Sequence, residues 1–586
     1  MYYNFAVKIP ENTGKISKNT RGDHTYIEYT YDRKYNPKKK YNIPLRTTIG
    51  KQVKDDPSMM YPNPNFEKFF PEVSLPDNEC SKDPSRSSCI KVGAFIVIKK
   101  IIDDYHLVEH LGQWDSRGTG LLLDLASYSV ISENNAAQHY PEYAYNHPVF
   151  TPEHKIYSDS TISRFMSEIS DNDRIAFLNS WNEKRNHREQ IYISYDSTNK
   201  NCKAGDIEMA EYGHAKDAKD DIGAPIINYS IAYDMNNQEP LLYESYPGSI
   251  VDVSQLQYLL EKVKGYGYRN IGFVLDRGYF SRDNISYMDQ CRYDFVIMVK
   301  GRASFINQMV LEHKGSFETK RANAIREYST YGMTIRTTLY ADDDKERYFH
   351  LYHKSSRENA ERNQLETNLL RMEEVMEKSK GKEVSFGKQY EHYYDLTYHE
   401  KDGCKRFYGY KEKEDVIERE LNLCGYFAIV TSKRMTAEEA LTLYKRRDAS
   451  EKLFCSDKTF LGNRSMGTSR NDTSQTKIFI EFIALIIRCR IYTQLRKRMS
   501  EMSKKPNYMT VPAALRELEK IELIKQPGGN YKLDHALTAT QKTILGAFGI
   551  DEDSARTRAM LIGKELMNAA EPEKEEDYED GTNDFC

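Results

Sequence analysis

The chain contains 586 residues, of which 39% are hydrophobic and 29% charged, and its formal net charge is −4 at pH 7. This composition indicates a globular protein, and the length predicts roughly three to four domains. Nine cysteines at irregular spacing, with no C-x-x-C pair, argue against a disulfide framework. The longest apolar run, residues 478–487, contains Glu481 and is too short to span a bilayer. We therefore expect a cytoplasmic protein with no membrane partner.

Charge is distributed unevenly along the chain. The first 51 residues contain eleven Lys or Arg against four Asp or Glu, whereas the last sixteen contain eight Asp or Glu against one Lys and are typical of a solvated acidic tail. Residues 26–50 alternate as two strands around the basic stretch DRKYNPKKK, which is either a solvated hairpin tip or an arm that contacts phosphates. Residues 52–89 are rich in Pro, Ser and Asp and indicate a linker. Residues 1–90 are thus predicted to be a basic strand region followed by a linker.

Residues 91–188 follow a helical period. Within them, His106, Glu109 and His110 match the H-x-x-E-H pattern of one class of zinc peptidases. Such a zinc site needs a third ligand in a defined downstream context. The sequence offers no convincing one, so an ordinary amphipathic helix is the favoured interpretation.

Strands and helices alternate from residue 189 onward. EQIYISYDST is a short strand, and the run from APIINYSIAYD to LLYESYPG predicts two strands about the turn MNNQ. A helix, DVSQLQYLLEKVKGYG, precedes an apolar strand that ends in LDRGYFS, and a further helix precedes the strand YDFVIMVKG. This order predicts a mixed α/β layer over residues 189–300, with carboxylates at the ends of strands.

Residues 301–423 interrupt this layer with two hairpins and a charged helix between them, and we interpret them as a β-rich insertion. The sheet is expected to resume with CGYFAIVTS at residue 424, and residues 424–500 form the second part of the core. Residues 501–586 are interpreted as a C-terminal helical segment and the acidic tail.

One amphipathic helix is predicted over residues 436–462, and Thr436 followed by Glu439 is a capping-box pattern at its start. At about 100° per residue, four polar side chains fall within one narrow stripe of this helix. They are Tyr444, Arg447, Glu451 and Lys458. The ordinary explanation of such a stripe is a solvated Arg–Glu pair at positions i and i+4.

Three carboxylates have a similar setting in the predicted layer: Asp196 in YDST, Asp276 in LDRGYFS, and Glu451 on the helix. Hard cations such as Mg²⁺ prefer oxygen ligands. Two such ions about 3.5–4 Å apart can activate a water or a 3′-hydroxyl and stabilise the leaving oxygen of a phosphodiester. Because the chain has 88 acidic residues, three at the ends of elements also arise by chance. Spacing alone therefore leaves the metal site open.

The motifs themselves are more specific than their spacing. The Tyr444, Arg447, Glu451 and Lys458 set matches the Tyr-Arg-Glu-Lys signature of a group of bacterial insertion-sequence transposases with a DDE catalytic triad, the insertion-sequence-four-like superfamily. YDST and LDRGYF resemble the group's motifs for the first and second catalytic Asp, in the correct order. The stretch from YIEYTYDRKYNPKKK to RTTIGK is similar to the N-terminus of one subgroup.

The resemblance implies a ribonuclease-H-like core made of residues 189–300 and 424–500, carrying the β-rich insertion 301–423. It also implies a helical DNA-binding region at 91–188 and C-terminal helices that pair subunits. By resemblance, the catalytic residues are also the ligands of two Mg²⁺ or Mn²⁺ ions: Asp196, Asp276 and Glu451.

The same resemblance assigns DNA contacts to the stripe and to the second Asp motif. Tyr444, Arg447 and Lys458 would hold phosphates of the transposon end, since Arg grips a phosphate bidentately and Lys supplies a point charge. Arg277 and Tyr279 are further candidates for contacts near the cleaved strand, although Tyr279 can equally be a packed aromatic residue.

The function implied is that of a cut-and-paste DNA transposase in the bacterial cytoplasm, which cleaves the ends of an insertion sequence and transfers its 3′ ends to target DNA. Its partners would be double-stranded DNA, at the terminal inverted repeats and the target, and a second subunit in a homodimeric synaptic complex. Two alternatives remain: a metal-dependent nuclease of the same fold without strand transfer, and a catalytically retired protein that only binds element ends.

Overall fold

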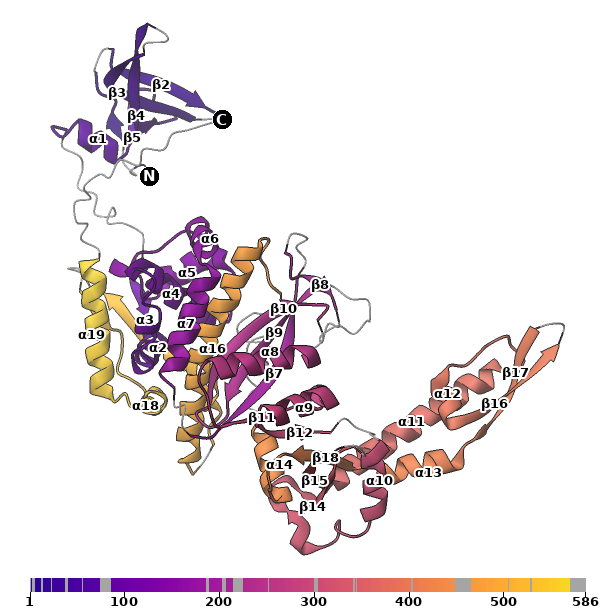
Figure 1. The fold of residues 1–586 in the computed structure, drawn as a ribbon. Coiled ribbons are helices and arrows are strands. Elements are labelled where there is room, and N and C mark those ends of the chain that lie inside the picture. The colour runs from indigo at the N-terminus through magenta and orange to yellow at the C-terminus, as the bar shows by residue number, and fades with distance from the viewer. Residues whose placement is uncertain are drawn as a thin grey trace. The chain divides into compact units, whose positions relative to one another are not determined.

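The computed structural model of the chain contains two units, Met1–Ser87 and Ser88–Cys586, called here the N-terminal unit and the main unit. Figure 1 shows their helices and strands. The structure describes all residues except 1, 3–5, 12, 13, 23, 37–39, 55, 74–85, 186–188, 203–206, 214–224, 251, 300–303, 341, 342, 344, 402, 403, 448–464, 504, 527–529 and 570–586.

The N-terminal unit is an antiparallel five-stranded sheet in the order β1-β5-β4-β3-β2. Its elements are β1 (Val7–Lys8), β2 (Ile16–Arg21), β3 (His24–Asn36), β4 (Tyr41–Gln52), β5 (Met59–Pro62) and α1 (Pro64–Phe69). The hairpin predicted within residues 26–50 is confirmed as β3 and β4. The linker predicted for residues 52–89 is wrong in its first part, because β5 and α1 lie there. They bury Met60 and Phe66 against Ile27 and Ile49 and so complete a small core.

The main unit is built on a mixed sheet of ten strands, in the order β10-β9-β7-β11-β12-β18-β15-β14-β13 with β8 beside β9. The strands are β7 (Ile191–Asn201), β8 (Glu211–Tyr212), β9 (Pro225–Asp234), β10 (Glu239–Pro247), β11 (Ile271–Leu275), β12 (Asp294–Met298), β13 (Ala324–Ile325), β14 (Thr330–Thr338), β15 (Glu346–His353) and β18 (Tyr426–Thr431). The neighbours β7, β11 and β12 run parallel, and the other pairs are antiparallel. The expected mixed α/β class is confirmed.

Part of the segment interpreted as an insertion belongs to this sheet. β14 and β15 extend it, and β15 pairs with β18 from Tyr348 opposite Thr431 to His353 opposite Tyr426. Alternating apolar residues identify a strand but do not name its partner, so the sequence could not show this continuity. The central sheet therefore continues through residues 324–353.

An arm that begins with α11 (Ser355–Ser379) and ends with α13 (Glu414–Leu423) leaves the sheet (Figure 1). It has a hydrophobic cluster of its own. Between these two helices lie α12 (Lys388–Tyr393), β16 (Tyr394–Lys401) and β17 (Cys404–Glu412). Leu365, Leu369 and Met376 of α11 pack there against Tyr394 and Phe407 of the hairpin. This cluster buries part of the arm's apolar surface, while other apolar side chains such as Leu370 and Tyr408 are exposed.

Helices cover residues 93–183, as the sequence predicts. They are α2 (Gly93–Asp104), α3 (Leu107–His110), α4 (Ser116–Ser132), α5 (Tyr140–Asn146), α6 (Asp159–Glu168) and α7 (Asp171–Glu183), with short 3-10 turns η1 (Ala137–His139) and η2 (Pro152–His154). Helices α2, α4 and α6 contact the long helix α16 (Asn471–Ser500), whose apolar run is buried in the main core. Among the described residues, no helix is long and apolar enough to cross a membrane.

The H-x-x-E-H residues do not form a zinc site. His106 has a left-handed backbone (φ 52°) and precedes α3, so it does not share a helical face with His110. His110 is buried, and its Nδ1 lies 2.8 Å from Oγ of Ser180. In the described parts of the chain, no group of three His, Cys, Asp or Glu side chains is arranged to hold a metal ion. The single amphipathic helix favoured for this stretch is interrupted, because α2 ends at Asp104 and α3 begins at Leu107.

The C-terminal segment packs onto the same core. Its elements are η6 (Asn507–Met509), α17 (Val511–Leu518), β19 (Glu522–Lys525), β20 (Tyr531–Leu533), α18 (Ala539–Gly546) and α19 (Glu552–Asn568). β19 pairs with β6 (Cys89–Lys91), the strand that precedes α2. Leu515, Leu518, Ile562 and Leu566 are buried in the main core. The expectation that this segment pairs subunits stays a prediction.

The remaining elements of the main unit connect the strands of the sheet along the chain. They are α8 (Asp252–Gly265), η3 (Arg277–Tyr279), α9 (Arg282–Gln290), α10 (Ser304–His313), η4 (Arg321–Asn323), η5 (Arg326–Tyr328) and α14 (Ala437–Arg446). Helix α14 follows β18 and contacts β11, β12 and β14. It therefore contacts β11, the strand that leads to the second Asp motif.

Candidate active site

The first two carboxylates of the proposed triad lie side by side because their strands are neighbours. β7 and β11 run parallel, and Tyr195 pairs with Leu275. Asp196 is the next residue of β7 and Asp276 directly follows β11, and adjacent strands lie only about 4.8 Å apart. Each carboxylate accepts a hydrogen bond from the following backbone amide, Asp196 from Ser197 at 2.9 Å and Asp276 from Arg277 at 2.7 Å. These bonds fix the direction in which both carboxylates point.

Helix α14 delivers Tyr444 to this pair. Its capping box is confirmed, because Thr436 Oγ1 accepts from the amide of Glu439 and Glu439 Oε2 accepts from the amide of Thr436. Leu441 and Tyr444 of the helix are buried. The Tyr444 hydroxyl donates a hydrogen bond to Oδ1 of Asp276 at 3.1 Å. Tyr444 thus contacts a carboxylate, and only 5% of it is exposed.

Arg447 bridges the two carboxylates. Its guanidinium nitrogens lie 3.7 Å from Oδ2 of Asp196 and 3.8 Å from Oδ1 of Asp276. The Arg447 side chain is 7% exposed, whereas the carboxylates are 22% and 38% exposed. The guanidinium also lies over the Tyr444 ring, 5.4 Å from its centroid. The buried guanidinium of Arg447 therefore offsets the repulsion between the two carboxylates, which are themselves partly exposed to solvent.

Helix α14 ends at Arg446, and Arg447 is its C-cap. The predicted helix over residues 436–462 is confirmed for Ala437–Arg446. The part of that prediction from residue 448 onward lies outside the described residues. Glu451 and Lys458 fall within residues 448–464 and lie outside the described residues. Of the predicted stripe, the structure places Tyr444 and Arg447 together at the carboxylates.

The two further candidates beside Asp276 differ in exposure. Arg277 is exposed at the start of η3. Tyr279 is 3% exposed, its hydroxyl donates to Oγ of Ser197 at 3.1 Å, and its ring centroid lies 5.3 Å from that of Tyr195. The alternative left open for Tyr279, a packed aromatic residue, is the one found. Tyr279 links η3 to β7 directly beside Asp196.

A buried ion pair on the same strand was not predicted. Lys200, four residues after Asp196 on β7, pairs with Glu481 of α16, and neither side chain is more than 2% exposed. The ammonium group also lies 5.0 Å from the centroid of the Tyr229 ring. In the sequence, only Glu481 within an apolar run indicates such a pair, because a buried carboxylate requires a partner. The pair fixes the far end of β7 to the longest helix of the core.

The donor set fits a divalent metal. Asp196 and Asp276 present carboxylate oxygens, which hard cations prefer, from two rigid adjacent strands. Partial exposure leaves room for water and substrate oxygens, which Mg²⁺ usually retains in its coordination sphere. These two residues supply two of the three carboxylates that the resemblance implies.

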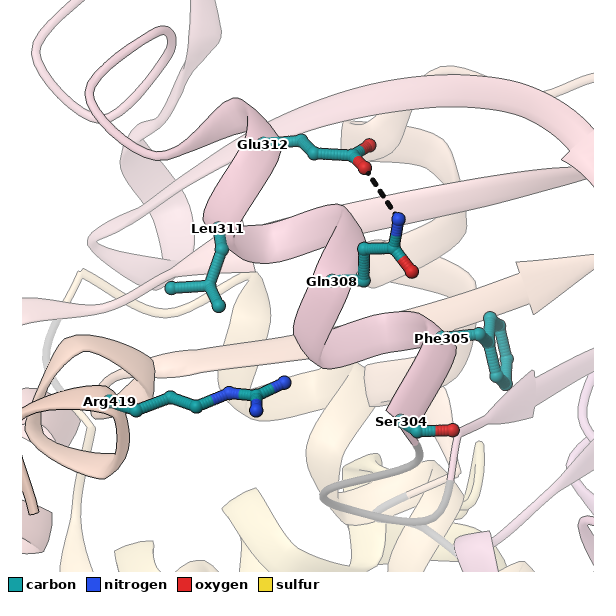
Figure 2. A pocket seen from close by; sticks show the side chains of 6 residues that line it. All are labelled: Ser304, Phe305, Gln308, Leu311, Glu312 and Arg419. Carbon is teal, nitrogen blue, oxygen red and sulfur yellow. Dashed lines mark hydrogen bonds between the residues drawn. The ribbon is translucent and has the colours of Figure 1, made fainter. Parts of the chain in front are cut away.

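A separate hollow lies between α10 and α13, and Figure 2 shows its lining. Gln308 donates a hydrogen bond to Glu312 at 2.9 Å on one wall, and Arg419 projects from the other helix. The lining includes neither Asp196 nor Asp276. The hollow is therefore not part of the carboxylate site.

The family model described as "Transposase DDE domain" matches residues 193–487, half of the chain. The chain belongs to the DDE transposase family. The match begins on β7, three residues before Asp196, and ends within α16, so it spans both Asp motifs and helix α14 of this transposase.

Other comparisons are more distant. No curated protein matches the sequence. Among solved structures, the transposase is similar to the "piggyBac transposase synaptic complex with hairpin DNA", determined by cryo-EM. The TM-score is 0.38 at 9% sequence identity, and the alignment covers 83% of this chain and 87% of that chain.

Proposed function

We propose that this transposase acts by the cut-and-paste route and belongs to the bacterial insertion-sequence group with the Tyr-Arg-Glu-Lys signature. The observation that carries the proposal is the Asp196–Asp276 pair, bridged by Arg447 and bonded by Tyr444. Tyr444 and Arg447 belong to the signature and lie far from the Asp motifs in the sequence. They nevertheless contact the two carboxylates that the resemblance assigns to the catalytic triad. A stripe that served only as a surface ion-pair row would not do so.

The proposed core is ribonuclease-H-like. Support comes from the mixed sheet, in which the first Asp lies on β7 and the second directly after its parallel neighbour β11. In the described chain, β18 and α14 then return to the same sheet after the arm. Glu451 would follow α14 and complete the triad.

The proposed catalytic residues are Asp196, Asp276 and Glu451, as ligands of two Mg²⁺ or Mn²⁺ ions. When bound, such ions would activate the attacking water or 3′-hydroxyl and stabilise the leaving oxygen. Asp196 and Asp276 are held in place by the backbone amides of Ser197 and Arg277. Tyr444 restrains the Asp276 carboxylate, and Arg447 offsets the repulsion between the two negative groups.

The proposed DNA contacts are made by Arg447, Lys458 and Arg277, with Tyr444 positioned beside them. Arg277 is exposed next to Asp276 and can reach a phosphate of the strand to be cleaved. Arg447 faces the carboxylates, so it would meet a phosphate only on the side where the metal-bound strand lies. The proposed partners are the terminal inverted repeats, target DNA and a second subunit, in a synaptic homodimer in the bacterial cytoplasm.

Cleavage of a supercoiled plasmid that carries the gene with its flanking DNA tests this function. We expect nicking and excision with Mg²⁺ or Mn²⁺, and none with Ca²⁺ or a chelator. Asp196→Asn, Asp276→Asn and Glu451→Gln should each abolish nicking while leaving a gel shift on the element end. Asp283→Asn is the matched control, because Asp283 is an exposed acid in the first turn of α9.

Each result separates the alternatives. Nicking without joined products identifies a nuclease that lacks strand transfer, and end binding without any nicking identifies a retired protein. Full activity in a chelator contradicts the metal mechanism. Near-normal cleavage by one of the three carboxylate variants removes that residue from the triad.

A further inference from the structure

The distal half of the β3–β4 hairpin concentrates positive charge. Residues 31–46 contain six Lys or Arg and a single acidic residue, Asp32, whose carboxylate accepts a hydrogen bond from the amide of Arg33 at 2.7 Å. At the base of the hairpin, Arg21 and Arg46 lie 3.6 and 4.0 Å from Glu28. Within the described part of this unit, no carboxylate forms an ion pair with Arg33, Lys34 or Lys40. The distal cations are therefore available to an external anion.

This ribbon extends past the core of its unit. Ile27 and Ile49 are buried in the basal half, whereas the five side chains from Tyr31 to Tyr35 are all exposed. The strands nevertheless stay paired as far as Asn36 opposite Tyr41. A two-stranded hairpin without a covering layer is only marginally stable in water. The extension thus adds little to folding, and its exposed side chains require another explanation.

Both faces of the ribbon carry a cation and an aromatic ring. Arg33 and Tyr35 are two residues apart on β3 and share one face. Lys34 lies on the opposite face, as does Tyr41, which pairs with Asn36. Tyr35 is 58% exposed and Tyr41 53%. A ligand that contacts only one side would leave half of this arrangement unused.

The dimensions favour the major groove of duplex DNA. A single sheet layer with its side chains is about 10 Å thick. The major groove is about 12 Å wide and admits a two-stranded ribbon, whereas the minor groove is only about 6 Å wide. A ribbon inserted between the groove walls meets a phosphate backbone on each face. Arg, Lys and Tyr side chains are all common phosphate contacts.

The helical region shows the opposite charge balance. Residues 91–188, expected from the resemblance to bind DNA, contain ten Lys or Arg against thirteen Asp or Glu. Most of α2 and α4 is buried in the main core. The surface left to these helices is thus less suited to a polyanion than the ribbon is.

We propose that the β3–β4 ribbon binds duplex DNA by entering its major groove, with Arg33 and Tyr35 on one backbone and Lys34 and Tyr41 on the other. The inference rests on the proposed function in that DNA is the substrate of the carboxylate site. The binding element would then lie in a different unit from the catalytic residues.

Fluorescence anisotropy of the full-length protein tests the ribbon, with a labelled duplex of about three helical turns and arbitrary sequence. Titrations run in EDTA, so that no strand is cut, at salt concentrations between about 50 and 200 mM. Arg33→Ala/Lys34→Ala should weaken binding at least tenfold and reduce the salt slope by about 1.8, since each lost phosphate contact removes about 0.9. Tyr35→Ala/Tyr41→Ala should weaken binding severalfold and leave the slope nearly unchanged.

Matched controls lie on the main unit. Arg556→Ala/Lys564→Ala removes two exposed cations of α19, and Tyr212→Ala/Tyr258→Ala removes two tyrosines that are 73% and 70% exposed. Both should bind like the wild type. Equal losses in ribbon and control variants overturn the proposal, as does wild-type affinity and slope in Arg33→Ala/Lys34→Ala. A loss confined to the single strand of the same sequence overturns the choice of duplex.

The test is independent of catalysis. Asp196→Asn should retain wild-type affinity for the duplex and the same dependence on Arg33 and Lys34. If plasmid cleavage fails while the ribbon variants lose duplex binding, the proposed catalytic function is wrong and the proposed DNA binding by the ribbon is supported. If cleavage is metal-dependent and the ribbon variants bind normally, the ribbon proposal falls alone.

Discussion

The hydroxyl of Tyr444 donates a hydrogen bond to Oδ1 of Asp276 at 3.1 Å, which links helix α14 to the end of strand β11. The same hydroxyl lies 3.7 Å from Sδ of Met298, at the end of β12. Tyr444 therefore occupies a buried position from which it can contact the carboxylate but not solvent. Its role in the proposed mechanism is to position Asp276.

Tyr444→Phe tests this positioning role. A hydrogen bond to a charged group contributes about 1.5–3 kcal/mol, and about 1.4 kcal/mol corresponds to a tenfold change in rate. We expect nicking to slow at least tenfold and the half-saturating Mg²⁺ concentration to rise, while duplex affinity changes little. Tyr492→Phe is the control, because the Tyr492 hydroxyl accepts from Arg496 at 3.0 Å and contacts no carboxylate of the site. An unchanged Mg²⁺ dependence would leave Tyr444 as a packing residue.

Arg447 should oppose the binding of a divalent ion to the free enzyme. Its guanidinium lies within 3.8 Å of both carboxylates, so part of their negative charge is already neutralised. Arg447→Ala is expected to tighten Mn²⁺ binding in the absence of DNA, by about threefold to tenfold if roughly 1 kcal/mol of repulsion is removed. Isothermal titration calorimetry with Mn²⁺ measures this change.

Cleavage by Arg447→Ala should nonetheless be lost, because the proposed phosphate contact disappears with the charge. Arg446→Ala is the matched control, since Arg446 is the exposed neighbour in the last turn of α14. Weaker Mn²⁺ binding in Arg447→Ala would contradict the prediction. It would show that the guanidinium orders the carboxylates more than it competes with the metal.

Part of the candidate site can be predicted from the sequence. Apolar runs that end in an acid predict Asp196 and Asp276 at strand ends, and the spacing of Tyr444 and Arg447 predicts that they share one helical face. Asp276 does follow the end of β11, but the prediction is wrong for Asp196, because β7 continues to Asn201 and Asp196 pairs with Ile231 of β9. What the sequence could not show was the register of β7 and β11, on which the distance between the carboxylates depends. Register is set by tertiary packing and by pairing between residues far apart in the chain.

The same limit explains the missed parts of the fold. β14 and β15 alternate as a hairpin does whether it stands alone or joins a sheet, so their pairing with β18 was not predictable from periodicity. In the sequence, Glu481 interrupts an apolar run, and this pattern does not identify its partner. Its partner Lys200 lies 281 residues away in a polar stretch that has no buried signature of its own.

Removing one partner of the Lys200–Glu481 pair should lower the free energy of unfolding strongly, whereas replacing both partners by apolar residues should lower it only slightly. Lys200→Met leaves a buried carboxylate uncompensated, and breaking such a pair typically costs about 3–5 kcal/mol. Lys200→Met/Glu481→Leu should recover most of that loss, because an apolar pair of similar volume avoids the desolvation of both charges. Urea unfolding of the two single variants and the double variant measures the coupling. Additive losses would show that the two side chains do not depend on each other.

Lys477 also interacts with Glu481. Its amine donates to the carbonyl of Met466 at 2.6 Å, and burial lowers its pKa while Glu481 opposes that shift. Glu481→Leu should therefore destabilise the protein through Lys477 as well as Lys200. Thr473→Ser is a conservative control on the same helix, since the Thr473 hydroxyl bonds only to the carbonyl of Arg470 among the described partners.

His350 should make stability fall in weakly acidic solution. The side chain is fully buried in β15, where Nδ1 lies 2.9 Å from Oγ1 of Thr334 and Nε2 lies 3.0 Å from Oγ1 of Thr431. Burial lowers the pKa of His350 to about 4, and Glu439 opposes this shift only in part. In the unfolded chain the pKa is near 6.5, so between pH 6.5 and about 4 only the unfolded state takes up the proton. Stability from this residue is therefore complete above pH 6.5 and falls by up to roughly 3 kcal/mol as the pH drops to 4.

His350→Gln isolates this contribution, because glutamine keeps a neutral polar group between the two threonines but does not titrate. Other groups also titrate in this range: burial lowers the pKa of His110 to about 4, and raises that of Asp124 to about 7. Asp124 acts in the opposite sense, since its folded form retains a proton that the unfolded chain releases above pH 4. These contributions are common to both proteins and cancel in the difference between wild type and variant. We expect the wild type to be the more stable at pH 7 and to lose that advantage by pH 4.5 in urea unfolding. Parallel pH profiles for the two proteins would show that the imidazole gains a proton in the folded state as readily as in the unfolded one.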